Sequence, residues 1–250
     1  MGRWSRKLAV EVVGRLARPA GLRWLDVGCG TGALSKAILE GAAPASVIGI
    51  DPSVEFVTSA SEEVADDRAV FQVAGAEALP LNDASVDVVA SGLVLNFVPD
   101  VVAAIGEMQR VVVPDGLVTA YVWDYGDGMQ MLRYFWDAAT VHDAATADLD
   151  EATRFPVCQK GGLQESFVAA GLQDVQEFAV SILTRFKDFD DFWLPFLGAQ
   201  GPGPSYVAGL SNASQDGLRS QLQSMLPVLP DGSIQLTARA WTASGVAPSV

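Results

Sequence analysis

Short hydrophobic runs alternate with segments of helical periodicity through the first 125 residues. Apolar residues spaced three and four apart predict helices at 5–17, 33–40 and 101–112, and hydrophobic runs predict strands at 22–27, 47–50, 69–73, 86–91 and 117–124. Ser53 follows the second strand and predicts the N-cap of a further helix. Strands that alternate with helices pair in parallel through right-handed crossovers. The pattern therefore predicts a doubly wound α/β sheet.

The second half of the chain has a different pattern. It predicts helices at 129–146 and 163–170 and strands at 175–186 and 234–241. An irregular insert of loops and helices, 187–231, separates the two late strands and is rich in aromatic side chains. These are Phe189, Phe192, Trp193, Phe196 and Tyr206. Such residues usually form core, but in a glycine-rich insert they also suit a lid over an apolar substrate.

We therefore expect one domain over 1–250. Its cofactor-binding core would be 1–125, and its substrate-cap elements would be 126–172 and 187–231. The length of 250 residues is ordinary for a single α/β unit.

Composition narrows the possible partners. The chain carries 16 Lys and Arg against 30 Asp and Glu, a formal charge of −14, which disfavours nucleic acid and membrane surfaces. Two cysteines and one histidine are too few for a disulfide framework or a Cys- and His-rich metal site. We expect a cytoplasmic protein, a monomer or homodimer, that holds no metal.

A glycine-rich turn is the most informative local motif. Residues 25–32 are Leu-Asp-Val-Gly-Cys-Gly-Thr-Gly, so a buried strand runs into three alternating glycines and then a helix. Glycine allows positive φ and close approach of a ligand to the main chain. In an open α/β sheet such a turn lies where ligands bind, beyond the carboxyl ends of the strands. A ligand is therefore expected over Gly28, Gly30 and Gly32.

The glycines alone do not identify the ligand. Gly28, Gly30 and Ala33 also fit a dinucleotide fingerprint loosely. Asp51 ends the second strand, and an acidic residue there accepts hydrogen bonds from ribose hydroxyls in either class of ligand. It disfavours a 2′-phosphate because two anions would face each other. At this point both an NAD-dependent oxidoreductase and another nucleoside-binding enzyme remain open.

Four stretches in order resemble the class I S-adenosylmethionine-dependent methyltransferases that act on small molecules. They are 25–34, with Asp26 two residues before the first glycine; Gly49-Ile50-Asp51-Pro52-Ser53; Ala76-Glu77-Ala78-Leu79-Pro80 followed by 85–89; and Pro114-Asp115-Gly116. The resemblance implies a seven-stranded sheet of Rossmann-like type, completed by a C-terminal antiparallel hairpin, with a helical lid insert. It also implies S-adenosylmethionine as cofactor.

The resemblance also assigns candidate cofactor contacts. Asp26 would hold the ammonium group, the glycine turn would lie under the methionine chain, and Arg6 could pair with the carboxylate. The family often has Asp where this chain has Gly75, so Glu77 or the backbone must substitute at the adenine. The full set of expected contacts is Trp4, Arg6, Asp26, Gly28, Cys29, Gly30, Asp51, Pro52, Ser53, Gly75, Ala76, Glu77, Ser91, Gly92 and Leu93.

The acceptor side is predicted from position along the strands. Asn96 and Phe97 follow the fourth strand, and Trp123 and Tyr125 end the fifth, so we expect these four residues at the substrate. His142 is the side chain with an ordinary pKa near neutrality, which makes it the candidate general base. Tyr121, Asp124 and Tyr125 are rival bases, and methyl transfer can also proceed with little help from a base.

The leading hypothesis is in-line methyl transfer from S-adenosylmethionine to an oxygen, nitrogen or carbon atom of a small molecule. An NAD-dependent oxidoreductase is the first alternative. A non-methylating S-adenosylmethionine-binding protein of the same fold is the second.

Overall fold

The computed structural model describes residues 2–198 and 201–249. The chain falls into two compact units. Of the described residues, the sheet unit comprises 2–122, 160–180 and 241–249, and the helical unit comprises 123–159, 181–198 and 201–240. The strand order is β3-β2-β1-β4-β5-β7-β6 in one seven-stranded sheet. The strands are β1 (Arg23–Val27), β2 (Ser46–Asp51), β3 (Ala69–Val73), β4 (Val86–Gly92), β5 (Val112–Trp123), β6 (Gln173–Phe186) and β7 (Ile234–Val246).

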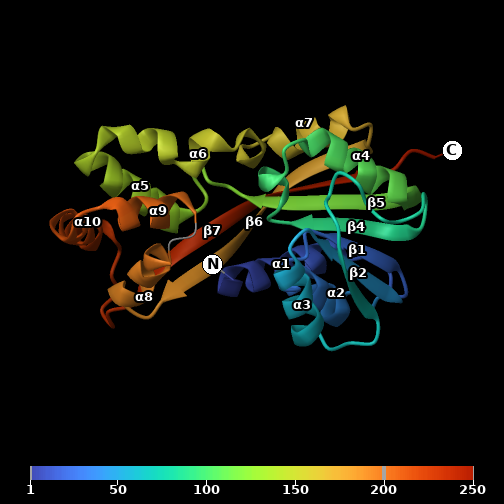
Figure 1. Cartoon of the computed structure of the whole chain (residues 1–250), viewed down its shortest axis with the longest axis horizontal. Helices are drawn as coiled ribbons and strands as arrows, with labels where there is room; N and C mark the ends of the chain where they lie inside the picture. The colour runs from blue at the N-terminus through green and yellow to red at the C-terminus, as the bar shows by residue number, and fades with distance from the viewer. Residues whose placement is uncertain (1, 199–200, 250) are drawn as a thin grey trace. The chain divides into compact units, whose positions relative to one another are not determined.

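The first five strands are parallel, with β1 pairing with both β2 and β4. The chain order reverses between β1 and β4, which is the point where ligands bind in doubly wound sheets. The late strands β6 and β7 form an antiparallel hairpin at the other edge (Figure 1). The predicted fold class is confirmed.

Helices cover both faces of the parallel strands (Figure 1). On one face lie α1 (Gly2–Leu16), α2 (Ala33–Gly41) and α3 (Val54–Glu63), and on the other lie α4 (Val101–Val111) and α7 (Gly162–Ala169). Their buried residues follow the helical period that the sequence shows. Helices on both faces explain why every residue of β1 after Arg23 is buried.

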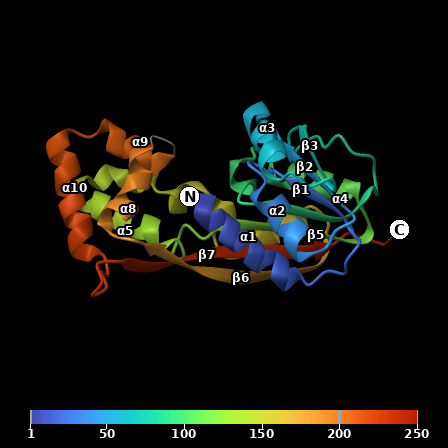
Figure 2. The same ribbon diagram turned by 90° about the horizontal axis from the view of Figure 1, so that it is seen from below.

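The helical unit is built around α5 (Gln130–His142), against which α9 (Pro202–Gly209) and α10 (Asn212–Met225) pack (Figure 2). Shorter helices complete it: η2 (Ala144–Leu149), α6 (Glu151–Arg154), η3 (Pro156–Cys158), α8 (Phe189–Trp193) and η4 (Leu194–Leu197). The rings of Phe135 and Phe196 stack with centroids 4.2 Å apart, and both are buried. The aromatic residues of the insert therefore form much of the core of this unit.

Two predictions of local structure were wrong in extent. The insert predicted to combine loops and helices is helical over more of its length than expected, and it contains the 14-residue α10, whose N-cap Ser211 accepts a hydrogen bond from the Ser214 amide. The final strand continues to Val246, beyond the predicted end at Trp241. Pairing supports this extension, since the Thr119 hydroxyl donates to the Ala243 carbonyl at 3.0 Å. Long-range contacts of this kind override the low strand propensity of Ser and Gly.

Candidate functional site

The glycine turn joins β1 to α2 in the sheet unit. Its three glycines have φ values of +75°, +53° and +84°, which L side chains rarely adopt. A Cβ at Gly32 would lie 2.5 Å from Val64, so this glycine admits close packing of α3. A Cβ at Gly30 would meet nothing within 4 Å. The main chain at Gly30 therefore borders open space.

Asp51, at the end of β2, holds this turn in place. One of its carboxylate oxygens accepts from the Gly30 amide and the other from the Ser53 amide, each at 3.0 Å. Ser53 in turn caps α3 by accepting from the Phe56 amide, as predicted. A carboxylate oxygen has more than one lone pair, so Asp51 keeps capacity to accept from hydroxyl groups.

Asp26 lies on β1 just before the turn and is fully buried. Its Oδ2 accepts from the Ser35 hydroxyl at 2.7 Å, while its Oδ1 has no hydrogen-bond partner within residues 2–198 and 201–249. Burial, with a smaller contribution from the charge of Asp51, raises the pKa of Asp26 to about 7. A buried carboxylate oxygen such as Asp26 Oδ1 is normally hydrogen-bonded, and a cationic donor would best stabilise its ionised form.

The loop after β3 lies next to Asp51, because the Ala74 amide donates to the Asp51 carbonyl at 3.1 Å. Gly75 borders open space, and Ala76 follows it. Glu77 Oε1 accepts from the Asp100 amide at 3.1 Å, so this carboxylate is engaged at the start of α4. Glu107 and Arg110 of α4 clamp the rest of the loop: Glu107 accepts from the Leu79 amide at 2.8 Å, and Arg110 donates to the Leu79 carbonyl at 3.0 Å.

The end of β4 brings further predicted residues to the same edge. Ser91 donates to the Val27 carbonyl at 2.9 Å, which ties β4 to β1. Leu93 has φ of +64°, an uncommon conformation for a branched side chain. Asn96 lies in the short helix η1 (Leu95–Phe97), where it is buried and its Nδ2 lacks a partner among the residues described. Phe97 is exposed.

Val94 was not predicted at this site. A Cβ on Gly28 would lie 2.4 Å from a methyl group of Val94, so this side chain covers the first glycine directly. Val94 follows Leu93, whose φ of +64° lies in the left-handed region. No sequence pattern predicts this backbone conformation for a leucine. The contact therefore had no local signal.

Arg6 lines a pocket of about 170 Å³ at the start of α2, together with Lys36 and the backbone around Gly32 and Ala33. The N-terminus of a helix carries partial positive charge, and two cationic side chains add to it, although Glu63 at the rim opposes them. The pocket fits an anionic group. Trp4 lies two residues before Arg6 in α1 and is half-buried, with the Arg3 guanidinium 4.5 Å from its ring centre.

Cys29 and Cys158 are free and buried, one in each unit. Burial, helped by the nearby charges of Asp26 and Asp51, raises the pKa of the Cys29 thiol far above its usual value. For Cys158, burial raises the pKa to about 12. Neither thiol is suited to act as a nucleophile at neutral pH.

The remaining predicted residues belong to the helical unit. Trp123 and Tyr125 are buried there, and the Tyr125 ring packs against Phe155 with centroids 5.9 Å apart. Burial raises the pKa of Tyr125. His142 is exposed at the last position of α5, where its ring lies against Gly217 of α10. Within residues 2–198 and 201–249, no side-chain hydrogen bond orients His142 as a base.

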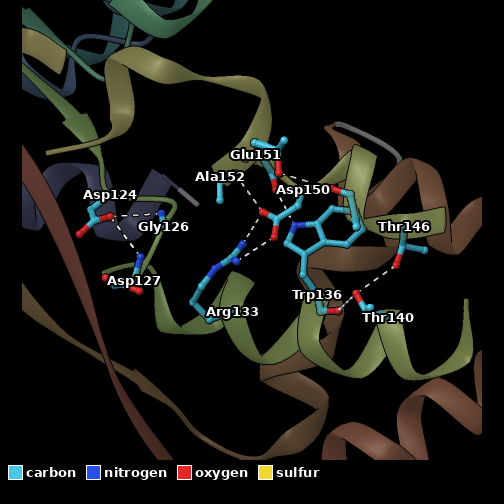
Figure 3. A network of polar contacts seen from close by, with 12 residues as sticks. Asp124, Gly126, Asp127, Arg133, Trp136, Thr140, Thr146, Asp150, Glu151 and Ala152 are labelled. Carbon is cyan, nitrogen blue, oxygen red and sulfur yellow. Dashed lines mark hydrogen bonds and ion pairs between the residues drawn. The ribbon is translucent and has the colours of Figure 1, made fainter. Parts of the chain in front are cut away.

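A buried polar network in the helical unit was also not predicted (Figure 3). Arg133 pairs with both oxygens of Asp150, and the Trp136 indole donates to Glu151 at 2.6 Å. Burial raises the pKa of Glu151. Asp124 accepts from the Gly126 amide at 3.1 Å (Figure 3) and from the Arg239 guanidinium at 2.6 Å. Asp124, Asp150 and Glu151 lie in short helices and turns, where the sequence shows no hydrophobic periodicity that would predict their positions.

A family model described as a methyltransferase domain matches residues 25–120 of the chain. Residues 25–120 therefore belong to the methyltransferase domain family. The methyltransferase domain contains Asp26, the glycine turn, Asp51 and the loop after β3. No group of three or more His, Cys, Asp or Glu side chains in the described ranges could hold a metal ion.

Similar proteins agree with this assignment. The chain is 31% identical over 188 residues to 2-methyl-6-phytyl-1,4-hydroquinone methyltransferase of a Synechocystis species, covering 73% of this chain and 57% of that protein. It spans about half the length of the curated relatives that it matches.

Among solved structures, the YcgJ protein of Bacillus subtilis superposes with a TM-score of 0.61 at 19% identity, covering 99% of this chain and 100% of that one. Phosphoethanolamine N-methyltransferase 2 of Haemonchus contortus, in complex with S-adenosyl-L-methionine, gives 0.60 at 18% identity, covering 97% and 53%. The resemblance inferred from the motifs is thus confirmed for family and fold.

Proposed function

We propose that the chain transfers a methyl group from S-adenosylmethionine to a small-molecule acceptor. The observation that carries this proposal is the Oδ1 atom of Asp26, a buried carboxylate oxygen without a partner among the described residues, four residues before the open main chain at Gly30. An ammonium group would satisfy that oxygen. The curated hydroquinone methyltransferase and the methyltransferase domain match support the choice of reaction.

The residues present fit the parts of this cofactor. Asp26 would accept from the ammonium group, Asp51 would accept from the ribose hydroxyls, and the pocket at Arg6 would take the carboxylate. The adenine would then lie beyond Asp51, at the loop after β3, which follows β2 in the strand order. Bound there, S-adenosylmethionine supplies an activated methyl group. The other expected contacts stay part of the proposal: Trp4, Gly28, Cys29, Pro52, Ser53, Gly75, Ala76, Glu77, Ser91, Gly92 and Leu93.

On the acceptor side, the chain's role is to position the reactants and exclude water. Orientation alone can contribute roughly 7–11 kcal/mol to such a reaction. Asn96, Phe97, Trp123 and Tyr125 stay the proposed substrate residues. His142 stays the proposed general base, and its variant His142→Gln should lower turnover by about a hundredfold or more if it takes the proton. Equal turnover by His142→Gln would remove it from the mechanism.

Calorimetry with S-adenosylhomocysteine and with NADH tests the cofactor assignment. We expect S-adenosylhomocysteine to bind and NADH not to bind. Binding of NADH alone would favour the oxidoreductase alternative. Release of S-adenosylhomocysteine is then measured with a panel of hydroquinones, phenols, amines and carboxylates. Binding of the cofactor without turnover on any of them would favour the non-methylating alternative.

The acidic charge of −14 supports the absence of nucleic-acid and membrane partners in this proposal. No helix within the part of the chain that the structure describes is long and apolar enough to cross a membrane. A cytoplasmic location and a monomeric or homodimeric state complete the proposal. Light scattering of the purified protein measures the oligomeric state directly.

A further inference from the structure

Tyr121 of β5 lies across Gly92 of β4, its register partner in the parallel pair. A Cβ added to Gly92 would lie 2.4 Å from the Tyr121 hydroxyl oxygen and 2.6 Å from the ring carbon that bears it. Only glycine therefore lets the phenol reach over β4. The Leu93 amide donates to the Tyr121 carbonyl at 2.7 Å, which fixes this register at the end of the strand.

The phenol reaches over the same face of the sheet that carries Asp26. Asp26 is the register partner of Ala90, and Gly92 follows Ala90 by two residues, so all three positions share one face. Tyr121 is buried, and burial together with the charge of Asp26 raises its pKa. It stays a neutral phenol at physiological pH. This excludes Tyr121 as a general base but leaves its oxygen free to accept a hydrogen bond.

An ammonium group has three N–H donors and needs more than one acceptor when it is buried. Asp26 Oδ1 offers one acceptor. Resting on the proposed function, we propose that the Tyr121 hydroxyl is a second acceptor for the ammonium group of S-adenosylmethionine, positioned by the glycine at 92. The tyrosine then helps to select a ligand with an intact amino-acid end.

Two ligands that differ at that end test the proposal. S-adenosylhomocysteine carries the ammonium group, and 5′-methylthioadenosine lacks the whole amino-acid end. Tyr121→Phe keeps the ring and removes the hydroxyl. We expect calorimetry to show that it lowers affinity for S-adenosylhomocysteine about tenfold, as a hydrogen bond to a charged group implies. Affinity for 5′-methylthioadenosine should change less than about twofold, because that ligand makes no such bond.

Tyr134→Phe is the matched control, since Tyr134 is half-buried in α5 of the helical unit and should alter neither affinity. Unchanged S-adenosylhomocysteine binding by Tyr121→Phe, or equal loss for both ligands, would overturn the proposal while the proposed function stands. Failure of the unaltered protein to bind S-adenosylhomocysteine would instead overturn the proposed function itself.

Gly92→Ala tests the same contact from the neighbouring strand. The added methyl group would displace the Tyr121 hydroxyl, so the selective loss of S-adenosylhomocysteine affinity should recur. If Tyr121→Phe melts below the assay temperature, this variant decides the question by the same criterion: selective loss supports the proposal, and equal or absent loss overturns it.

Discussion

The sheet unit and the helical unit treat buried acids in opposite ways. In the helical unit, Asp150 pairs with Arg133 and Glu151 accepts from the Trp136 indole. In the sheet unit, Asp26 keeps an oxygen without a partner among the described residues, four residues before the open main chain at Gly30. Paired acids hold a fold together, whereas a buried carboxylate oxygen left without a donor suits a ligand that supplies one. The unmet acceptor on Asp26 therefore distinguishes the candidate site from the paired acids of the helical unit.

The comparison predicts its largest effect on stability for Arg133→Gln in the helical unit. Removing the guanidinium leaves the half-buried Asp150 without its cation, which should lower the free energy of unfolding by about 3 kcal/mol. Urea denaturation measures this loss. Affinity for S-adenosylhomocysteine, measured at a temperature where the variant is folded, should not change. Arg185→Gln breaks an exposed pair with Asp231 and should cost about 0.5 kcal/mol or less. Equal costs would mean that the buried network does not stabilise the unit.

Asp51→Ala should have the largest effect on binding. It removes the acceptor for the Gly30 and Ser53 amides and for the ribose hydroxyls together. We expect affinity for S-adenosylhomocysteine to fall about a hundredfold in calorimetry, because several hydrogen bonds are lost at once. Asp66→Ala, which breaks only an exposed pair with Arg68, is the control. Unchanged affinity for S-adenosylhomocysteine in Asp51→Ala would show that the ligand does not bind at this edge of the sheet.

Two alanine substitutions in the glycine turn separate packing from binding. Both sites have positive φ, so Gly30→Ala and Gly32→Ala each cost about 1–2 kcal/mol in backbone conformation. Only Gly32→Ala adds an overlap, with Val64 at 2.5 Å. We expect it to lower the melting temperature further, whereas Gly30→Ala should weaken S-adenosylhomocysteine binding more than it lowers stability. The reverse pattern would contradict the assignment of open space at Gly30 to the ligand.

The pH dependence of binding is the smallest and most specific effect. Burial raises the pKa of Asp26 to about 7, and an ammonium group favours the ionised carboxylate. Affinity for S-adenosylhomocysteine should therefore fall about tenfold for each pH unit below 7, measured by calorimetry between about pH 5.5 and 7.5. In Asp26→Asn this slope should vanish. A flat profile in the unaltered protein would show that Asp26 does not meet the ammonium group.

The ionisation of Asp26 also makes the free energy of unfolding depend on pH. An unfolded Asp loses its proton near pH 3.9, whereas buried Asp26 holds it until about pH 7. The folded chain thus binds more protons between these values, so the contribution of Asp26 to stability decreases as pH rises from about 4 to about 7. Bound ligand should oppose this loss.

The sequence predicted most of the sheet unit because its signals are local. Hydrophobic runs marked the parallel strands, the three glycines marked the turn, and Asp51 marked the end of β2. Ser53 was correctly predicted as a cap. Each of these features depends on a few neighbouring residues, and so can be recognised without knowledge of distant contacts.

The features that were missed depend on distant contacts. Val94 covers Gly28 from the turn after β4, and Tyr121 reaches over Gly92. Glu151 lies in a four-residue helix, too short to show a period, and finds its partner in α5. The candidate site was thus predicted at its backbone, while the side chains that cross between strands became visible only in three dimensions.

The placement of the two cysteines has a practical consequence. A thiol that is buried and protonated reacts with an alkylating reagent only when the surrounding structure opens. Cys29 lies within the glycine turn and Cys158 within η3, so the labelling rate of each one measures how often its own unit opens. Added S-adenosylhomocysteine should slow the labelling of Cys29 and leave that of Cys158 unaltered.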